Sequence, residues 1–257
     1  MNHILFPTDF SGNSEHALPF ALEVARIFDA EVTLFNTYQL PSSKSNLLLS
    51  IQDRMKKDSE EGLIELKDIA LKKDKYKHLK INTASRSGGF VTSIPKIADY
   101  TNCDLIVMGT KGASGLKEMF IGSNTLEVIQ TTKCPVLAIP ENAVLKTISK
   151  IAFATDFRKL KNQNTLNPLF EIAKKLQLPV EFVNVLRAIE EDTSESIAAN
   201  AIELERLAEG IKTSIFFISN SDIIEGISEY INEVKPDIFV MLSRKHTLFE
   251  RMFLKSI

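Results

Sequence analysis

The chain has 257 residues, of which 44% are hydrophobic and 25% charged, and this length predicts two domains that each bury a core without metal or disulfide support. Its 31 basic and 33 acidic residues nearly cancel, which excludes a nucleic-acid scaffold and a polybasic membrane-surface protein. Two cysteines cannot build a disulfide framework or a four-thiolate zinc site, and no apolar run is long enough to cross a bilayer. The amino terminus shows no signal-peptide pattern, so we expect a cytoplasmic protein.

The two halves of the chain repeat each other. Residues 4–10 return as residues 151–157, and residues 104–108 return as residues 237–241. Two further blocks, in the first helix and the second strand, recur between them in the same order. We therefore predict one fold in two copies, a first domain at 1–140 and a second at 150–257. The linker at 141–149 is short, so we expect the two domains to pack together.

In the first copy, short apolar strands alternate with helical patterns. The predicted strands lie at residues 3–8, 31–36, 80–84, 104–109 and 135–139. Asn13 or Ser14 is expected to cap a helix that runs through Arg26, and the charged segment 45–75 is helical for much of its length. A last helix opens at Gly122 and runs to about Thr132. The alternation predicts an α/β fold with an open parallel sheet of the Rossmann-like kind.

The second copy follows the same plan but stops early. Its predicted strands lie at residues 150–155, 180–185, 213–218 and 237–242. The sequence ends where the last helix and fifth strand should follow, so the second domain is expected to lack both. A sheet without that strand would expose an apolar edge. A truncated chain, a disordered tail and an edge covered by a partner all stay open as readings of the end at Ile257.

The carboxyl ends of the strands are where an open parallel sheet binds its ligands. After the fourth strand come Gly109 and Gly112, and nine residues later Gly122 and Ser123 open a helix. Glycines let backbone approach a ligand, and the free N–H groups of a helix start attract anions. The pattern is neither a Walker loop nor the Gly-x-Gly-x-x-Gly of dinucleotide folds. By these arguments alone the loop is either a phosphate site or a simple connection.

The spacing Gly109-x-x-Gly112, nine residues, Gly122-Ser123 resembles the ATP-binding signature of universal stress proteins. The flanking residues agree, with Val107-Met108 before it and Cys134-Pro135-Val136-Leu137 after it, and so does the opening segment 7–11, Pro-Thr-Asp-Phe-Ser. Together with the repeat, the chain is identified as a tandem member of that family. The resemblance implies two α/β sandwiches, an adenine-nucleotide pocket, and dimerisation through the fifth strand.

The resemblance also assigns roles to residues of the first copy. Asp9 and the backbone near Thr37 would meet adenine and ribose, and Pro7, Thr8 and Met108 would line the pocket. The phosphates would be held by Gly109, Gly112, Gly122, Ser123, Asn124 and Thr125. Two of these residues have an equally simple structural reading. Asp9 could cap its own turn, and Met108 reads more naturally as a core residue of the fourth strand.

The second copy has lost the glycines of the motif. Aligning Met108 with Met241 places Leu242, Lys245 and Lys255 at the three glycine positions. Side chains there would occupy the space that the loop needs as bare backbone. We therefore expect one nucleotide site per chain, in the first domain.

These observations lead to an ATP-binding regulatory protein of a stress response. The alternatives are a slow ATPase or autophosphorylating enzyme, with Ser123 or Thr125 as acceptor, and an interaction scaffold that binds no nucleotide. No catalytic set or metal cluster is evident, so we expect at most weak ATP hydrolysis; Asp9 could hold Mg²⁺ through the phosphates. Cys103 and Cys134 are expected to be inert structural thiols. The expected partners are an adenine nucleotide and a second copy of the chain, with no nucleic acid and no membrane.

Overall fold

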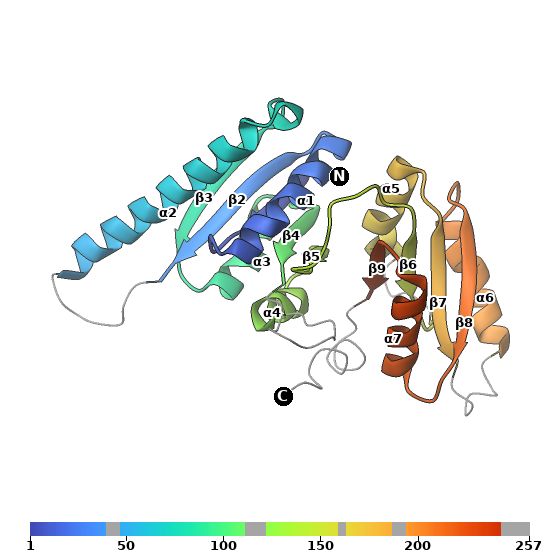
Figure 1. Ribbon diagram of the computed structural model, residues 1–257. Coiled ribbons are helices and arrows are strands. Elements are labelled where there is room, and N and C mark those ends of the chain that lie inside the picture. The colour runs from blue at the N-terminus through green and yellow to red at the C-terminus, as the bar shows by residue number, and fades with distance from the viewer. Residues whose placement is uncertain (40–46, 111–121, 159–162, 187–193, 243–257) are drawn as a thin grey trace. The chain divides into compact units, whose positions relative to one another are not determined.

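The structure is a computed structural model that describes residues 1–39, 47–110, 122–158, 163–186 and 194–242. The chain divides into two compact units, Met1–Leu145 and Lys146–Ile257, and the division falls within the predicted linker. Each unit is an open sheet of parallel strands with helices on both faces (Figure 1), which confirms the predicted α/β class. In the described part of the chain, no helix is long and apolar enough to cross a membrane.

In the first unit the described residues form a five-stranded sheet of order β3-β2-β1-β4-β5. Its strands are β1 (His3–Pro7), β2 (Glu31–Tyr38), β3 (Ile81–Ser87), β4 (Leu105–Gly109) and β5 (Val136–Ile139). Its helices are α1 (Gly12–Phe28), α2 (Leu47–Leu71), the 3-10 helix η1 (Asp74–Tyr76), α3 (Phe90–Tyr100) and α4 (Ser123–Thr131). β1 connects to β2 on one side and pairs with β4 on the other, so the chain order reverses between β1 and β4. Ligands of such sheets bind at this switch point, beyond the carboxyl ends of the strands.

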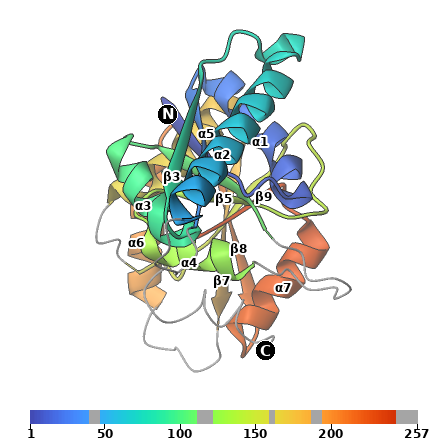
Figure 2. The same ribbon diagram turned by 90° about the vertical axis from the view of Figure 1, so that its left-hand side faces the viewer.

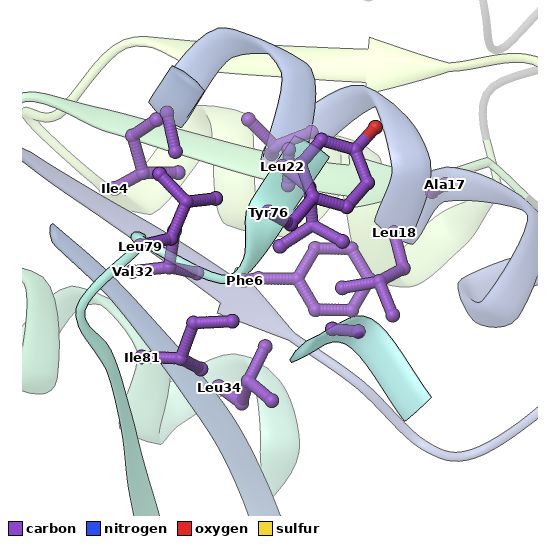
Figure 3. Close-up of a cluster of buried hydrophobic side chains, with 14 of the residues drawn as sticks. Ile4, Phe6, Ala17, Leu18, Leu22, Val32, Leu34, Tyr76, Leu79 and Ile81 are labelled. Atoms are coloured by element: carbon purple, nitrogen blue, oxygen red, sulfur yellow. The ribbon is translucent and has the colours of Figure 1, made fainter. Parts of the chain in front are cut away.

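Alternate residues of the central strands build two cores. Ile4 and Phe6 of β1 point to the side covered by α1 and α2, where they pack with Leu22, Leu63 and Tyr76. Figure 3 shows part of this cluster, with Phe6 and Tyr76 at its centre. The intervening residues face α3 and α4 in a second cluster, which contains Leu5, Phe35, Ile94, Ile106, Met108 and Val128. Both faces are therefore buried, as expected of parallel strands linked by helical crossovers.

The long helix α2 lies along β2 and β3 (Figures 1 and 2). Leu63, Leu66 and Ala70 are its buried contacts with the sheet. The charged residues predicted for this segment form exposed pairs one turn apart, such as Lys56 with Glu60. Exposed pairs of this kind add little stability, so the apolar face holds the helix in place.

The second unit repeats the first in a four-stranded sheet of order β8-β7-β6-β9. Its strands are β6 (Ile151–Ala154), β7 (Val180–Leu186), β8 (Thr213–Ser219) and β9 (Ile238–Met241). Its helices are the 3-10 helix η2 (Gln163–Leu166), α5 (Asn167–Leu176), α6 (Ser194–Leu207) and α7 (Ile223–Val234). No counterpart of α4 or β5 occurs among the described residues, and residues 243–257 lie outside them.

The predicted cap of the first helix is wrong. Ser11 is the N-cap residue of α1, and its hydroxyl accepts a hydrogen bond from the Ser14 N–H at 3.3 Å. The Ser14 hydroxyl is instead buried, 2.8 Å from the Thr8 hydroxyl. The helix therefore begins at Gly12, directly after the turn that follows β1, because Ser11 supplies the cap while the Ser14 hydroxyl bonds to Thr8 and to the Ser11 carbonyl.

Candidate functional site

The turn after β1 is held by its own side chains. The Thr8 hydroxyl accepts the Phe10 N–H at 3.0 Å, and Asp9 Oδ1 accepts the Ser11 N–H at 3.0 Å. Phe10 has a φ of 59°, so the backbone is left-handed between these two bonds. Partial burial acts to raise the pKa of Asp9, but hydrogen bonds from Ser11 and Ser14 outweigh it and lower the pKa below its ordinary value. Asp9 is therefore an exposed, ionised carboxylate at the end of β1.

The same turn recurs in the second unit. Thr155 Oγ1 accepts the Phe157 N–H at 3.0 Å, and Asp156 Oδ1 accepts the Arg158 N–H at 3.1 Å. Phe157 has a φ of 49°, close to that of Phe10. This second turn follows β6, in the unit whose sequence lacks the motif glycines. The hydrogen bonds of Thr8 and Asp9 are thus part of the fold, and a ligand would use the atoms that these bonds leave exposed.

A buried polar network fixes the end of β1 from behind. Asn36 of β2 donates through Nδ2 to the Thr8 carbonyl at 2.7 Å. Ser59 of α2 donates to Asn36 Oδ1 at 2.6 Å, and its hydroxyl lies 2.7 Å from that of Ser85 on β3. Each side chain forms a hydrogen bond with the next one in the network. The network therefore connects β1, β2, β3 and α2 at the carboxyl ends of the strands. No sequence pattern indicated this network, because its bonded members are 23 to 28 residues apart.

Gly109, the last residue of β4, lies against the start of α1. A Cβ atom added there would stand 2.7 Å from the Asn13 carbonyl oxygen and 2.8 Å from Asn13 Nδ2. The absence of a side chain therefore lets α1 begin against the end of β4. Asn13 Oδ1 is buried and has no hydrogen-bond partner among the residues that the structure describes. An unused acceptor thus lies beside the switch point.

The start of α4 completes the edge. Gly122 is its N-cap residue, with φ −60° and ψ 154°, and no side chain of the described residues caps the helix. Thr125 is buried and donates to the Gly109 carbonyl at 3.1 Å, which ties the first turn of α4 to the end of β4. Ser123 and Asn124 are exposed on the same turn. The N–H groups at this end carry the positive end of the helix dipole.

The structure thus brings most of the predicted residues to one edge of the sheet. Pro7 pairs with Phe35 in the β1–β2 ladder, and Thr37 lies half-buried near the end of β2. Met108 is 3% exposed in the core between the sheet, α3 and α4, in agreement with its reading as a core residue. Gly112 lies outside the described residues, as do Lys245 and Lys255 of the second copy.

The strand registers support the alignment of the two copies. Ile4 pairs with Leu105, and its counterpart Ile151 pairs with Ile238. Counting on along both strands matches Met108 with Met241 and Gly109 with Leu242. The Leu242 side chain packs against the core of the second unit, so the bare backbone at the end of β4 has no equivalent after β9.

Comparison with known proteins agrees with this geometry. The model of the universal stress protein family matches residues 1–140. The chain belongs to the universal stress protein family. Universal stress protein MJ0531 of Methanocaldococcus jannaschii is 34% identical over 142 residues, covering 53% of this chain and 80% of the relative. Universal stress protein MJ0577 of the same organism is 33% identical over 151 residues, covering 53% and 93%.

A solved structure resembles both units. The crystal structure of a universal stress protein from Archaeoglobus fulgidus matches with a TM-score of 0.73 at 24% identity, over 93% of this chain and 86% of that one. At this identity the likeness shows the fold. The likeness extends over both sheets of this chain, so the fold of both units resembles that of a solved universal stress protein.

Proposed function

We propose that the first unit binds one molecule of ATP at the carboxyl edge of β1 and β4, and that the protein acts as a nucleotide-dependent regulator in a stress response. The observation that carries the proposal is the start of α4, which Thr125 ties to the end of β4 at the switch point of the sheet and which no side chain in the described part of the chain caps. Backbone N–H groups at such a position form a ready anion site. The glycine spacing of the family signature meets this same helix start.

The residues at the edge suit the parts of a nucleotide. The exposed hydroxyl of Ser123 and the amide of Asn124 stand beside the N–H groups that would receive phosphate oxygens. On the other side of the switch point, the ionised Asp9 can accept hydrogen bonds from ribose hydroxyls, and Thr37 offers backbone near the base. Donors and acceptors are thus separated as phosphate and nucleoside require.

A Mg²⁺ ion would enter this site with the phosphates. Among the described residues, no group of three or more histidine, cysteine, aspartate or glutamate side chains could hold a metal on its own. The predicted phosphate loop follows β4, which pairs with β1. Asp9 lies two residues after the end of β1. We assign it contact with the nucleoside or with phosphate-bound Mg²⁺.

A regulator and an enzyme differ in what becomes of the nucleotide. In the regulatory reading, ATP orders the edge around α4 and changes what the protein presents to a partner. We extend the proposal to a cytoplasmic protein that dimerises through β5, the edge strand of the first sheet. ADP release or a phosphorylated Ser123 during long incubation would favour the enzyme, and sedimentation would test the dimer.

The test replaces a residue without weakening its helix. Ser123→Asp puts a carboxylate in the first turn of α4, where negative charge stabilises a helix but repels phosphate. We expect ATP binding at one site per chain in the unmodified protein, measured by calorimetry, and a loss of at least about tenfold in affinity in Ser123→Asp. Ser123→Ala is the matched control and should lose much less.

Three results would overturn parts of the proposal. Undiminished affinity in Ser123→Asp would move the phosphates away from α4. Two sites per chain would mean that the second unit also binds. No binding to the folded protein would leave the glycine loop as a connection in an interaction scaffold.

A further inference from the structure

The only two cysteines of the chain meet in the first unit. Cys103 and Cys134 are 31 residues apart in sequence, yet their Sγ atoms lie 3.4 Å apart. The Cys134 Sγ is also 3.2 Å from the Cys103 carbonyl oxygen. Both thiols are free. The expectation that both are inert structural thiols did not anticipate this contact, because neither sequence neighbourhood contains the other cysteine.

Parallel pairing of β4 and β5 produces the contact. Cys103 precedes β4 by two residues and Cys134 precedes β5 by two, and the two strands are neighbours in register from Ile106 and Val136 onward. The Ile106 N–H also bonds the Pro135 carbonyl at 2.9 Å. The amino ends of the strands are therefore held together by the ladder, at the edge of the sheet opposite to the candidate nucleotide site.

The surroundings leave the pair both packed and accessible. Each cysteine is half-buried and packs against the core beneath α3 and α4. Both ring nitrogens of the neighbouring His3 have hydrogen-bond partners, the Thr101 carbonyl and the Thr33 hydroxyl. The Asp104 carboxylate accepts the backbone N–H of His3. No third ligand in the described residues joins the two sulfurs into a metal site. Two adjacent thiols in residues that are only partly buried are suited to redox chemistry.

We propose that Cys103 and Cys134 are a redox-active dithiol pair, which a hydroperoxide oxidises to a disulfide within one chain. A disulfide joins sulfur atoms about 2.05 Å apart. Starting from 3.4 Å, the bond closes with a small movement of two side chains. This site lies outside the proposed nucleotide site, and it does not depend on nucleotide binding.

The two sulfurs take different parts in the reaction. The hydrogen bond from Cys134 lowers the pKa of Cys103, and the same contact raises the pKa of Cys134. Because the Cys134 thiol donates to the Cys103 sulfur, we assign Cys103 as the thiolate that attacks the peroxide. Its sulfur forms a bond to one oxygen as the O–O bond breaks, which yields a sulfenic acid and an alcohol, or water from hydrogen peroxide. The Cys134 sulfur then attacks the sulfenic sulfur, and hydroxide leaves with the thiol proton as water. The pair loses two electrons, and the peroxide gains them.

The disulfide would join the two ends of a functional segment. Between Cys103 and Cys134 lie β4, the glycine loop and α4. A cross-link there restricts the conformations of this segment in the unfolded chain. Oxidation is therefore expected to raise the thermal unfolding midpoint of the first unit. Oxidant would in this way act on the same segment that the proposed nucleotide site uses, from the other end of β4.

The test uses the reduced full-length protein with hydrogen peroxide. After alkylation of the remaining thiols, we expect a monomer that has lost two hydrogens in mass and a non-reduced peptide pair joining Cys103 to Cys134. In Cys134→Ala, dimedone should trap a sulfenic acid on Cys103. In the reduced unsubstituted protein, a limiting amount of alkylating reagent should label Cys103 faster than Cys134, because more of Cys103 is thiolate.

Three outcomes would overturn the proposal. In the first, an oxidant that oxidises both thiols of the urea-unfolded chain would leave both reduced, and able to react with an alkylating reagent, in the folded protein. The pair would then be inert. Cross-links between chains would replace the intramolecular bond. Faster trapping on Cys134 than on Cys103 would reverse the assigned roles. The peptide map of the unsubstituted protein decides the first two even if a variant fails to fold.

Discussion

Asp9 and Asp156 occupy the same place in two copies of one turn. Each accepts the N–H of the residue two positions on, next to a left-handed phenylalanine. The sequence could not decide between a turn-forming and a ligand-binding aspartate. The structure shows that the turn bond is common to both units, so any binding role must appear as a difference between two residues with matched geometry.

This match supplies an internal control for a first prediction. Asn retains the side-chain acceptor that such a turn uses, so Asp9→Asn and Asp156→Asn should both stay folded, with equally small losses of stability. Only Asp9→Asn should weaken ATP binding, by about tenfold, since it removes a charge from the proposed site. Calorimetric titration of both variants measures this. Equal effects of the two substitutions would reduce Asp9 to a turn residue.

Gly109 shows how one residue type can serve two purposes. The sequence pattern indicated bare backbone at the end of β4 for the approach of a ligand. In the structure the atoms that crowd this position belong to Asn13 of α1. Sequence alone cannot separate these causes, because a phosphate and a helix start both need the space that a Cβ would fill.

Substitution of Gly109 should therefore cost stability even without nucleotide. In Gly109→Ala the new Cβ would meet the Asn13 carbonyl at 2.7 Å, so α1 or β4 must shift. We expect a loss of about 1–3 kcal/mol in the free energy of unfolding, measured by urea denaturation. Gly12→Ala is the control, because nothing lies within 4 Å of a Cβ there. Equal stability of the two variants would show that α1 does not rest on Gly109.

At the scale of elements, one aspartate in each unit links the first and fourth strands of its sheet, Asp104 in the first unit and Asp237 in the second. Asp104 accepts the His3 N–H in the first unit, and Asp237 accepts the N–H groups of Ser149 and Lys150 in the second. Asp237 also binds Lys146 at 2.6 Å and is 7% exposed. The bond from Lys146, with those from Ser149 and Lys150, holds the pKa of Asp237 well below its usual range.

The second unit should therefore lose stability in acid through Asp237. Because the folded pKa is depressed, its contribution is complete above the ordinary value of 3.8 and is lost as the pH falls below it. At pH 7, Asp237→Asn should destabilise this unit by about 1–3 kcal/mol through weaker hydrogen bonds to the amide. The difference from the unsubstituted protein should shrink as urea titrations move from pH 7 to pH 3. A difference independent of pH would mean that the charge of Asp237 contributes nothing.

The strands could be predicted from sequence more closely than the helix starts. The observed strands fall within a few residues of the predicted ones, because buried parallel strands are short apolar runs between turn residues. The start of α1 was missed because the Ser14 side chain pairs with Thr8, six residues earlier, a contact that helix-cap patterns do not contain. The Asn36–Ser59 bond and the cysteine contact escaped for the same reason, since topology alone brings their members together.

At the scale of the whole molecule, the chain carries one framework twice and the proposed site once. Both units keep the Thr-Asp-Phe turn and an asparagine that donates to the threonine carbonyl at 2.7 Å. They differ at the end of the fourth strand, where Gly109 borders α1 and Leu242 packs into a core. They also differ after the Thr-Asp-Phe turn: in the second unit the next α-helix begins only at Asn167, directly after the 3-10 helix η2 in the sequence. The signature glycines predicted the difference between Gly109 and Leu242 at the end of the fourth strand.

Nucleotide should accordingly protect one unit only. A ligand at 100 times its dissociation constant stabilises the state that binds it by about 2.7 kcal/mol, which slows exchange through unfolding of that state about 100-fold. We expect hydrogen exchange of the intact protein with ATP to slow in the core peptides of Met1–Leu145, including β1 and β4, and to stay unchanged in β6 and β9. Ser123→Asp should abolish the protection while leaving exchange without ATP nearly the same. Equal protection of both units would mean that they unfold together or that both bind, and the calorimetric stoichiometry separates these two cases. Protection of the second unit alone would place the nucleotide in the copy that lacks the glycines, and Leu242 at the end of the fourth strand would then not prevent nucleotide binding.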